Sequence, residues 1–287
     1  MPAATTHFEF AKDVYKTLDD SLKEKITNLP LFYLGSQGPD LFFFSHFSAL
    51  PNSLKKNGNY MHSYNVKETI TFMKDYVSMQ NMLYSYYAGF ICHYALDSNE
   101  HPLINKHAEM YHERYKTSVS IAHITSEAEI DCTILKERSS TINDYDVYKF
   151  MRVTDIDKKA LATMYKQLFK EVYNWDIKEK DIIEAINGIS KITKYLSPNS
   201  TKKYKFVTTV EDTFHLPKFV SGMMLNEKDS ASTVLNEDHS IHFMLNGEDN
   251  SSSFHELYKK ALEEVPKLLH NELDIERNFE GQSISSK

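Results

Sequence analysis

Glycine and proline, the residues that most often make turns, are scarce in this sequence of 287 residues. Each of them occurs only 8 times. Folds built from many short strands need many turns, so a chain with so few turn-forming residues is poorly suited to such a fold. The scarcity therefore favours an all-α fold.

Cysteine is scarcer still, with only Cys92 and Cys132, which lie far apart in the sequence. Two residues cannot supply a disulfide framework or a four-cysteine zinc site. We interpret both as reduced, buried thiols.

Long apolar runs are missing too. The N-terminus, MPAATTHFEFAKDVYK, lacks the apolar stretch and cleavage pattern of a secretory signal. The longest apolar runs, such as the one at residues 40–45, are far too short to span a bilayer. The sequence therefore predicts a soluble, cytoplasmic protein with no transmembrane segment.

Positive charge is not concentrated anywhere, and the formal net charge is −7. Proteins that bind duplex DNA regardless of sequence rely on clustered lysine and arginine. The absence of such a stripe argues against duplex nucleic acid as a partner. Cleavage of nucleotide phosphodiesters stays open, because bound metal ions can supply positive charge locally.

Apolar residues recur with helical spacing along most of the chain. The first predicted helix runs from Thr6 to about Ile26, and Thr5 or Thr6 could cap it. Further helices are predicted over residues 66–77, 81–98, 118–135, 157–172, 180–195 and 253–269. Pro102 is expected to end or bend the helix that begins at residue 81.

Four polar segments are predicted to be irregular. These are a turn at 35–40, a loop at 51–60, a linker at 197–203 and a long loop or lid at 225–253; the tail at 282–287 is expected to fray. No internal repeat or clean boundary is evident. We therefore predict a single multi-helix domain over residues 1–287, in which residues 1–135 carry the candidate metal ligands and residues 136–287 complete the helical fold.

Histidines concentrate in the first half of the chain, where eight of the thirteen lie. They are His7, His46, His62, His93, His101, His107, His112 and His123. In the strongly apolar helix predicted at 81–98, His93 and Asp97 are four residues apart, so both lie on one face about one turn apart. His101 continues that face, although the following proline places it at the expected helix end.

A second pair, His123 and Glu127, repeats the same spacing on another predicted helix, and Asp131 lies one turn further on. A single pair of this kind is usually only a hydrogen-bonded pair. Two pairs in apolar surroundings are different, because an uncompensated buried carboxylate is costly and a cation would compensate it. Imidazole and carboxylate together suit zinc, and iron or manganese stay open.

The order of these residues resembles the zinc-dependent phospholipase C family over about residues 1–135. The motifs that carry the resemblance are His7, Gly38-Pro39-Asp40, Met61-His62, the segment from Gly89 to Asp97 with His101-Pro102, and the segment from His123 to Glu127. The late segment at 253–258 is also similar to a feature of the family.

The resemblance implies an all-α fold that encloses a cluster of two or three Zn²⁺ ions. By position, Asp40, His62, His93 and Asp97 would bind the first ion; His101, His123 and Glu127 the second; and His7 with a bridging Asp97 the third. Secreted members use a processed N-terminal tryptophan at the third ion, whereas the single tryptophan here is Trp175. His101 also lies closer to Asp97 than its counterpart does, so His107 or His112 are alternative ligands.

The activity implied is hydrolysis of a phosphodiester, such as a phospholipid, by a zinc-activated water. Asp40 would act beside that water as ligand, general base or orienting group. Six aromatic residues could form an apolar wall for the substrate, although core packing is the simpler interpretation: Tyr33, Phe42, Phe43, Phe44, Tyr86 and Tyr87. Two alternatives are a single-strand nuclease of the same architecture and a non-catalytic, metal-stabilised helical binding protein.

Overall fold

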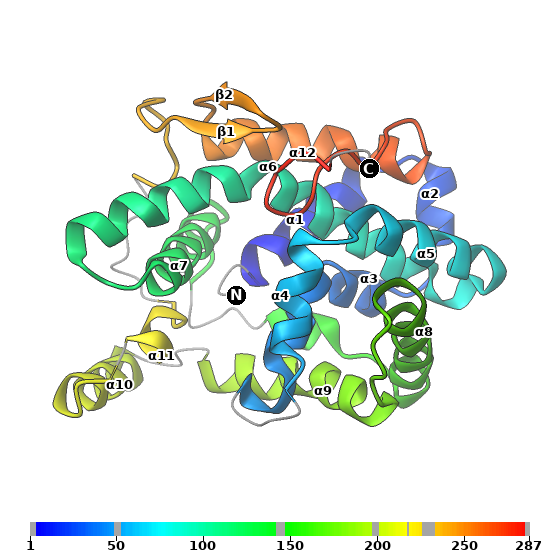
Figure 1. Cartoon of the computed structure of the whole chain (residues 1–287), viewed down its shortest axis with the longest axis horizontal. Coiled ribbons are helices and arrows are strands. Elements are labelled where there is room, and N and C mark those ends of the chain that lie inside the picture. The colour runs from blue at the N-terminus through cyan, green and yellow to red at the C-terminus, as the bar shows by residue number, and fades with distance from the viewer. Residues whose placement is uncertain are drawn as a thin grey trace.

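Helices make up most of the chain in a computed structural model, which describes residues 4–48, 53–141, 147–196, 201–216, 218–225 and 233–284 (Figure 1). The α-helices are α1 (Ala4–Thr17), α2 (Asp20–Lys25), α3 (Leu29–Gly35), α4 (Lys55–Ser63), α5 (Val66–Met79), α6 (Tyr84–Tyr115), α7 (Val119–Glu137), α8 (Asp155–Tyr173), α9 (Glu179–Leu196), α10 (Thr201–Thr213), α11 (Phe219–Gly222) and α12 (Phe254–Leu269). Three 3₁₀ helices, η1 (Gly38–Ser48), η2 (Asn81–Leu83) and η3 (Val147–Met151), join them. The all-α prediction is confirmed.

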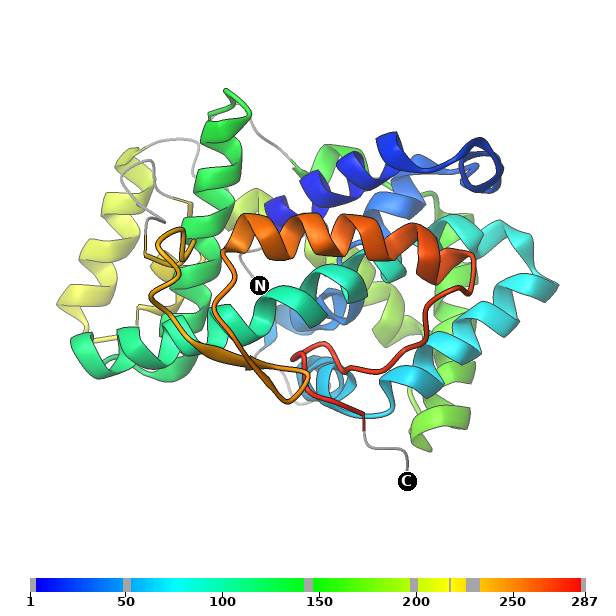
Figure 2. The same ribbon diagram turned by 90° about the horizontal axis from the view of Figure 1, so that it is seen from above.

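The long helix α6 is the element against which the others are arranged. It has 32 residues and is almost entirely buried up to Ala108. Helices α1, α3, α7 and α12 pack against it, and α12 lies beside part of its length (Figure 2). The helix thus carries His93, Asp97 and His101 through the interior on one continuous face.

The predicted helix end near Pro102 was wrong, because α6 continues for 13 residues beyond it. An internal proline removes one backbone hydrogen bond and strains the turn before it. Packing against neighbouring helices can outweigh that cost, since tertiary burial supplies most of a helix's stability. Helices α7 and α12 both pack against α6 and provide this support.

The first predicted helix is in fact two, α1 and α2, separated at Asp19. The Asp19 carboxylate accepts a hydrogen bond from the backbone N–H of Leu22 and so caps α2. A short acidic side chain competes in this way with an uninterrupted helical backbone. Leu18 and Leu22 remain buried on either side of the break, which explains why their spacing suggested one helix.

Three of the segments predicted to be irregular contain regular structure. Helix α4 begins at Lys55 within the expected loop, and α10 begins at Thr201 within the expected linker; residues 49–52 and 197–200 lie outside the described part. The expected loop at 225–253 contains a hairpin of β1 (Phe243–Leu245) and β2 (Glu248–Asn250), with Phe243 opposite Asn250. Residues 226–232 of it lie outside the described part.

Local chemistry explains the hairpin and the ordered end of the chain. Asn246 and Gly247 both have positive φ angles, of 53° and 82°, and an Asn-Gly pair readily adopts them in tight hairpin turns. The backbone N–H of Ile284 donates to the carbonyl oxygen of Glu276, so the expected fraying was wrong for residues 282–284. Residues 285–287 are not described.

Close packing of α3 on α6 sets the position of the segment that follows α3. A Cβ atom on Gly89 of α6 would lie 2.0 Å from the carbonyl oxygen of Phe32, so only glycine permits this approach. The contact brings Ser36, at the end of α3, beside His93 of α6. The loop at 36–38 and the start of η1 are thereby placed against the middle of α6.

Charged groups attach α1 to α7 and α12. The guanidinium of Arg138, after α7, contacts the Glu9 carboxylate at 3.0 Å and also pairs with Asp13. The hydroxyl of Tyr258 on α12 donates to Asp13 over 3.0 Å. These contacts hold α1 where its first turn meets α6 and α7.

Cys92 and Cys132 are both buried and are not joined by a disulfide, in line with the prediction of reduced thiols. Within the described part of the chain, no helix is both long and apolar enough to cross a bilayer. The division into a ligand-bearing part up to residue 135 and a helical completion stays a prediction.

Candidate metal centre

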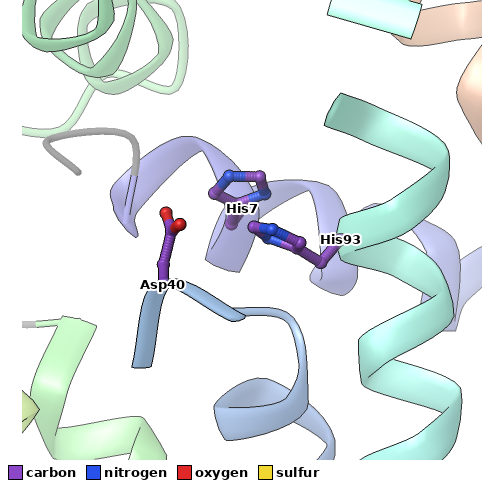
Figure 3. Close-up of side chains that lie close together, drawn as sticks. All are labelled: His7, Asp40 and His93. Carbon is purple, nitrogen blue, oxygen red and sulfur yellow. The ribbon is translucent and has the colours of Figure 1, made fainter. Parts of the chain in front are cut away.

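All eight predicted ligands converge on one interior region where five elements meet. They are His7 of α1, Asp40 of η1, His62 of α4, His93, Asp97 and His101 of α6, and His123 and Glu127 of α7. Seven of them are buried, and His123 is half-buried. Figure 3 shows three of these side chains, His7, Asp40 and His93, directed toward one another from three different elements.

Asp97 lies at the centre of this arrangement. Its Oδ1 atom is 3.2 Å from His7 Nε2, and its Oδ2 atom is 3.0 Å from His93 Nε2. The same Oδ2 atom is 3.6 Å from His101 Nε2 and 3.9 Å from His62 Nε2. Ligand atoms around a tetrahedral zinc lie about 3.3 Å apart, given zinc bonds of about 2.0–2.1 Å. The distances from the Asp97 oxygens to these imidazole nitrogens therefore fit side chains that bind the same cation.

Three groups of side chains each bring their ligand atoms within 4.8 Å of one another. They are His7 with Asp40 and His93, His62 with His93 and Asp97, and His101 with His123 and Glu127. The third group is the set expected for the second ion. The set expected for the first ion is spread over the other two groups, which share His93.

Hydrogen bonds on the outer side of the rings orient three of the imidazoles. The Nδ1 atoms of His62, His93 and His123 lie 2.8 Å from the carbonyl oxygen of Gly58, 3.1 Å from that of Ser36 and 2.9 Å from Asn105 Oδ1, respectively. An oxygen of this kind only accepts, so Nδ1 carries a proton, and Nε2 is the nitrogen that faces the cluster. Metal-binding histidines are held in this way.

Buried polar atoms without hydrogen bonds mark the inner side of the cluster. Among the described residues, His93 Nε2 and Asp97 Oδ2 make no hydrogen bond although they lie only 3.0 Å apart. Buried polar atoms normally find partners, and those that do not call for an ion, a water or another explanation. A cation between the two atoms would satisfy both, so the donor set fits zinc.

The structure explains why the Gly38-Pro39-Asp40 motif begins with glycine. Its φ angle is +49°, and a Cβ atom there would lie 2.0 Å from the Cδ2 atom of His93. The imidazole therefore occupies the space that a side chain at residue 38 would need. The same turn leads into η1 and directs Asp40 toward His62, whose Nε2 is 3.0 Å from Asp40 Oδ1.

Charge coupling sets the protonation of the metal-free cluster. Burial disfavours a charge on His62, but the hydrogen bond with Asp40 and the charges of Asp40 and Asp97 together outweigh burial and raise the pKa of His62 to about 9. Burial and the neighbouring His93 lower the pKa of His7 to about 4. Burial would raise the pKa of Asp97, but His101, His93 and His7 hold it well below its usual range.

The two alternatives to His101 are engaged elsewhere. His107 lies further along α6, with Nδ1 2.7 Å from Ser126 Oγ and Nε2 3.2 Å from Thr233 Oγ1. His112 is hydrogen-bonded through Nδ1 to the carbonyl oxygen of Thr117. The structure therefore brings His101, and neither alternative, next to His123 and Glu127.

The aromatic residues proposed for an apolar wall mostly belong to the core. Phe42, Tyr86 and Tyr87 are buried, and Tyr33 packs against Phe8. Phe43 is the exception, because its ring stacks on that of His62 at 5.5 Å. The side chain of Phe44 lies outside the described part of the structure.

Phe279 and Asn105 support the site but are not evident from the sequence. The ring of Phe279 packs against those of His62 and His93 at 5.3 and 5.4 Å, and its backbone N–H donates to the carbonyl oxygen of His62. No pattern links this C-terminal residue to histidines so far away. Asn105 could have been noticed, because it lies one turn after His101 on α6.

Asp131 holds the start of α1 beside the cluster. Its carboxylate accepts hydrogen bonds from the backbone N–H groups of Thr5, at 3.3 Å, and Thr6, at 2.8 Å, and from the Thr6 hydroxyl, at 2.6 Å. Unpaired N–H groups at a helix start favour a carboxylate in this position. The spacing of Asp131 after Glu127 placed it on the correct face of α7 but did not reveal this role.

A family model described as zinc dependent phospholipase C matches residues 6–179, which include all eight converging residues. No curated protein and no solved structure gives a significant match.

Zinc affinity should fall as the pH is lowered from 8 to 6. His62 must be neutral to bind a metal, and its metal-free pKa of about 9 means that zinc has to displace its proton in this range. His7, with a pKa of about 4, requires no such loss. Each displaced proton weakens apparent affinity by about tenfold per pH unit. Competition with a chelator would measure the zinc affinity at each pH, and calorimetry in two buffers would count the protons released. An affinity that does not change with pH would contradict the prediction.

Replacing Asp131→Asn should loosen α1. The Asp131 carboxylate accepts hydrogen bonds from Thr5 and Thr6, whereas the NH₂ group of an amide would face these donors with a donor of its own. The loss of a buried hydrogen bond costs about 1–3 kcal/mol. We expect that loss in the free energy of unfolding, measured by urea denaturation of metal-free protein at pH 8. The exposed Asp176→Asn control should change it by less than about 0.5 kcal/mol. Equal stabilities of the two variants would refute the role given to Asp131.

Proposed function

The chain belongs to the zinc-dependent phospholipase C family, and on that premise we propose that it hydrolyses phosphodiester bonds, with phospholipids as substrates. The observation that supports this proposal best is the buried convergence of five imidazoles and three carboxylates. Three of these rings are oriented by outer hydrogen bonds so that Nε2 faces inward. This arrangement of nitrogen and oxygen donors is suited to binding cations. The packing of a protein core does not require it.

In this proposal, zinc would be held by the three groups of side chains described above. When bound, zinc ions acidify water and neutralise the charge that builds on phosphoryl oxygens. Asp97 would fix the separation of the ions, since its two oxygens face different imidazoles. His62 and His93 would remain as neutral ligands because their Nδ1 protons are donated to backbone carbonyls.

Asp40 is the residue we propose as catalytic. Its side chain is 12% exposed, compared with 4% for both Asp97 and Glu127, so it is the most accessible carboxylate of the set. Burial would raise the pKa of Asp40, but the hydrogen bond and charge of His62 lower it. An ionised carboxylate accepts a hydrogen bond and can orient a water molecule. Orientation of the attacking water is therefore the role we assign to it.

The open side of the cluster lies at His123. Its side chain is 24% exposed, more than those of the other imidazoles in the set. An accessible ligand group is what a catalytic metal site requires, since a purely structural site is closed by protein ligands. This difference favours an enzyme over a metal-stabilised binding protein.

Substrate class can be tested on zinc-loaded protein with three substrates side by side: a short-chain phosphatidylcholine, bis-p-nitrophenyl phosphate and single-stranded DNA. We expect release of the phosphorylated headgroup from the phospholipid to be the fastest reaction. Faster cleavage of the DNA would replace the proposal by the nuclease alternative. A fully loaded protein inactive on all three would favour the non-catalytic alternative.

Asp97→Asn should abolish metal loading and turnover together. An amide at this position can neither balance the cations nor bind two of them through separate anionic oxygens, so we expect turnover to fall by at least about 10³-fold. The measurement is zinc content and diester hydrolysis of the same preparation. Asp75→Asn, an exposed change on α5, should leave both unchanged. A variant at residue 97 with full zinc content and full turnover would exclude Asp97 as a bridging ligand.

A further inference from the structure

Large apolar side chains are exposed on α10, on α11 and between them. Phe206 and Phe214 are each 69% exposed, Leu216 is 51% exposed and Val220 is 42% exposed. Both views show α10 at the periphery of the molecule, away from α5 and α8 (Figures 1 and 2). Single exposed apolar residues are common on proteins, but several on two helices that pack together mark a candidate interaction surface.

Apolar residues form a stripe along α10. Phe206, the half-buried Val210 and Phe214, which directly follows the helix, are spaced four residues apart and so share one face. In an ordinary surface helix the apolar stripe faces the core. Here two of its rings face solvent.

A buried carboxylate explains why α10 is turned this way. The side chain of Glu211 is only 4% exposed and accepts hydrogen bonds from the backbone N–H groups of Val220, at 3.0 Å, and Ser221, at 3.1 Å. Glu211 thus ties α10 to α11 from the inner side. The orientation with Phe206 and Phe214 outward is therefore built into the packing of these two helices.

Lysines surround the apolar stripe. Lys202, Lys205 and Lys218 are exposed on this surface, and Lys218 pairs with Asp212 at 3.1 Å. Their positive charge contrasts with the formal net charge of −7 for the whole chain. Apolar side chains bordered by lysine are typical of helices that lie in the interface of a bilayer with anionic lipids.

This surface adjoins α7, one of the helices that supply the metal centre. Helix α11 packs against α7, where a Cβ atom on Gly222 would lie 3.5 Å from Thr125 Oγ1 and 3.7 Å from Ile124 Cγ2. Both neighbours lie between His123 and Glu127 in sequence. His123 is also the most accessible imidazole of the centre. A bilayer bound at α10 and α11 would therefore lie next to the helix that carries His123 and Glu127.

We propose that α10 and α11, through Phe206, Phe214, Leu216 and Val220 with the bordering lysines, form the surface that binds the protein to an anionic phospholipid bilayer. This inference rests on the proposed function, because it supplies the access of that site to membrane lipids. A bilayer fits the surface better than a second copy of the chain, since two copies would bring the same lysines together.

Co-sedimentation with vesicles tests the proposal on zinc-loaded, full-length protein. The vesicles contain phosphatidylcholine, either alone or with phosphatidylserine. We expect stronger binding to the anionic vesicles, and binding weakened by at least about tenfold in the double variant Phe206→Ser/Phe214→Ser, because two large apolar side chains are removed from the interface. The matched control is Met79→Ser/Ile156→Ser, which removes side chains that are 77% and 73% exposed on α5 and α8. This control should bind like the wild type.

A soluble diester separates this proposal from the proposed function. The Phe206/Phe214 double variant should hydrolyse bis-p-nitrophenyl phosphate at the wild-type rate, which also shows that it folds, and should lose hydrolysis of vesicle phospholipid. Wild-type binding by this variant, or no binding of anionic vesicles by the wild type, would overturn the surface assignment even if the diester is cleaved. A wild-type dimer that the double substitution converts to a monomer, without vesicle binding, would overturn it in favour of self-association. Failure of every form to cleave any diester would instead contradict the proposed function.

Discussion

One buried carboxylate, that of Asp97, sets the constraint on which the rest of the centre depends. The Asp97 side chain is 4% exposed and has imidazoles at 3.0–3.9 Å around its two oxygens. A buried charge of this kind is costly unless cations or strong donors surround it. The surrounding helices supply those partners, and each partner is held in turn by an outer hydrogen bond, a close backbone contact or a packed ring. Three segments meet around this one carboxylate: the start of α1, the start of η1 and the middle of α6.

The length of α6 converts sequence spacing into geometry. Because the helix passes through Pro102 without ending, His93, Asp97 and His101 stay on a single face, and Asn105 continues that face toward His123. A helix that ended at the proline would have left His101 free to turn away. Because α6 is buried on all sides, its four-residue spacing directs these ligands to one interior site. The same burial explains why a helix-breaking proline is tolerated in α6.

The sequence predicted features that depend on neighbouring residues better than contacts between residues far apart in the chain. Four-residue spacing indicated that His93 with Asp97, and His123 with Glu127, would share helix faces, and few glycines and prolines indicated a helical fold. The contacts of Phe279 with His62 and His93, and of Asp131 with the start of α1, depend on how helices pack and left no trace in any local pattern. The break at Asp19 was missed because Leu18 and Leu22, buried on either side of it, keep helical spacing. The start of α4 at Lys55 was missed because the first residues of this helix are mostly polar and resemble a loop.

The proposed hydrolysis requires metal ions to be bound where these side chains converge. Elemental analysis of the purified chain, dialysed against zinc and then against metal-free buffer, measures this most directly. We predict two or three zinc ions retained per chain, removed by a strong chelator and recovered on adding zinc back. Retention of no metal by a folded chain would contradict the assignment of these side chains as zinc ligands.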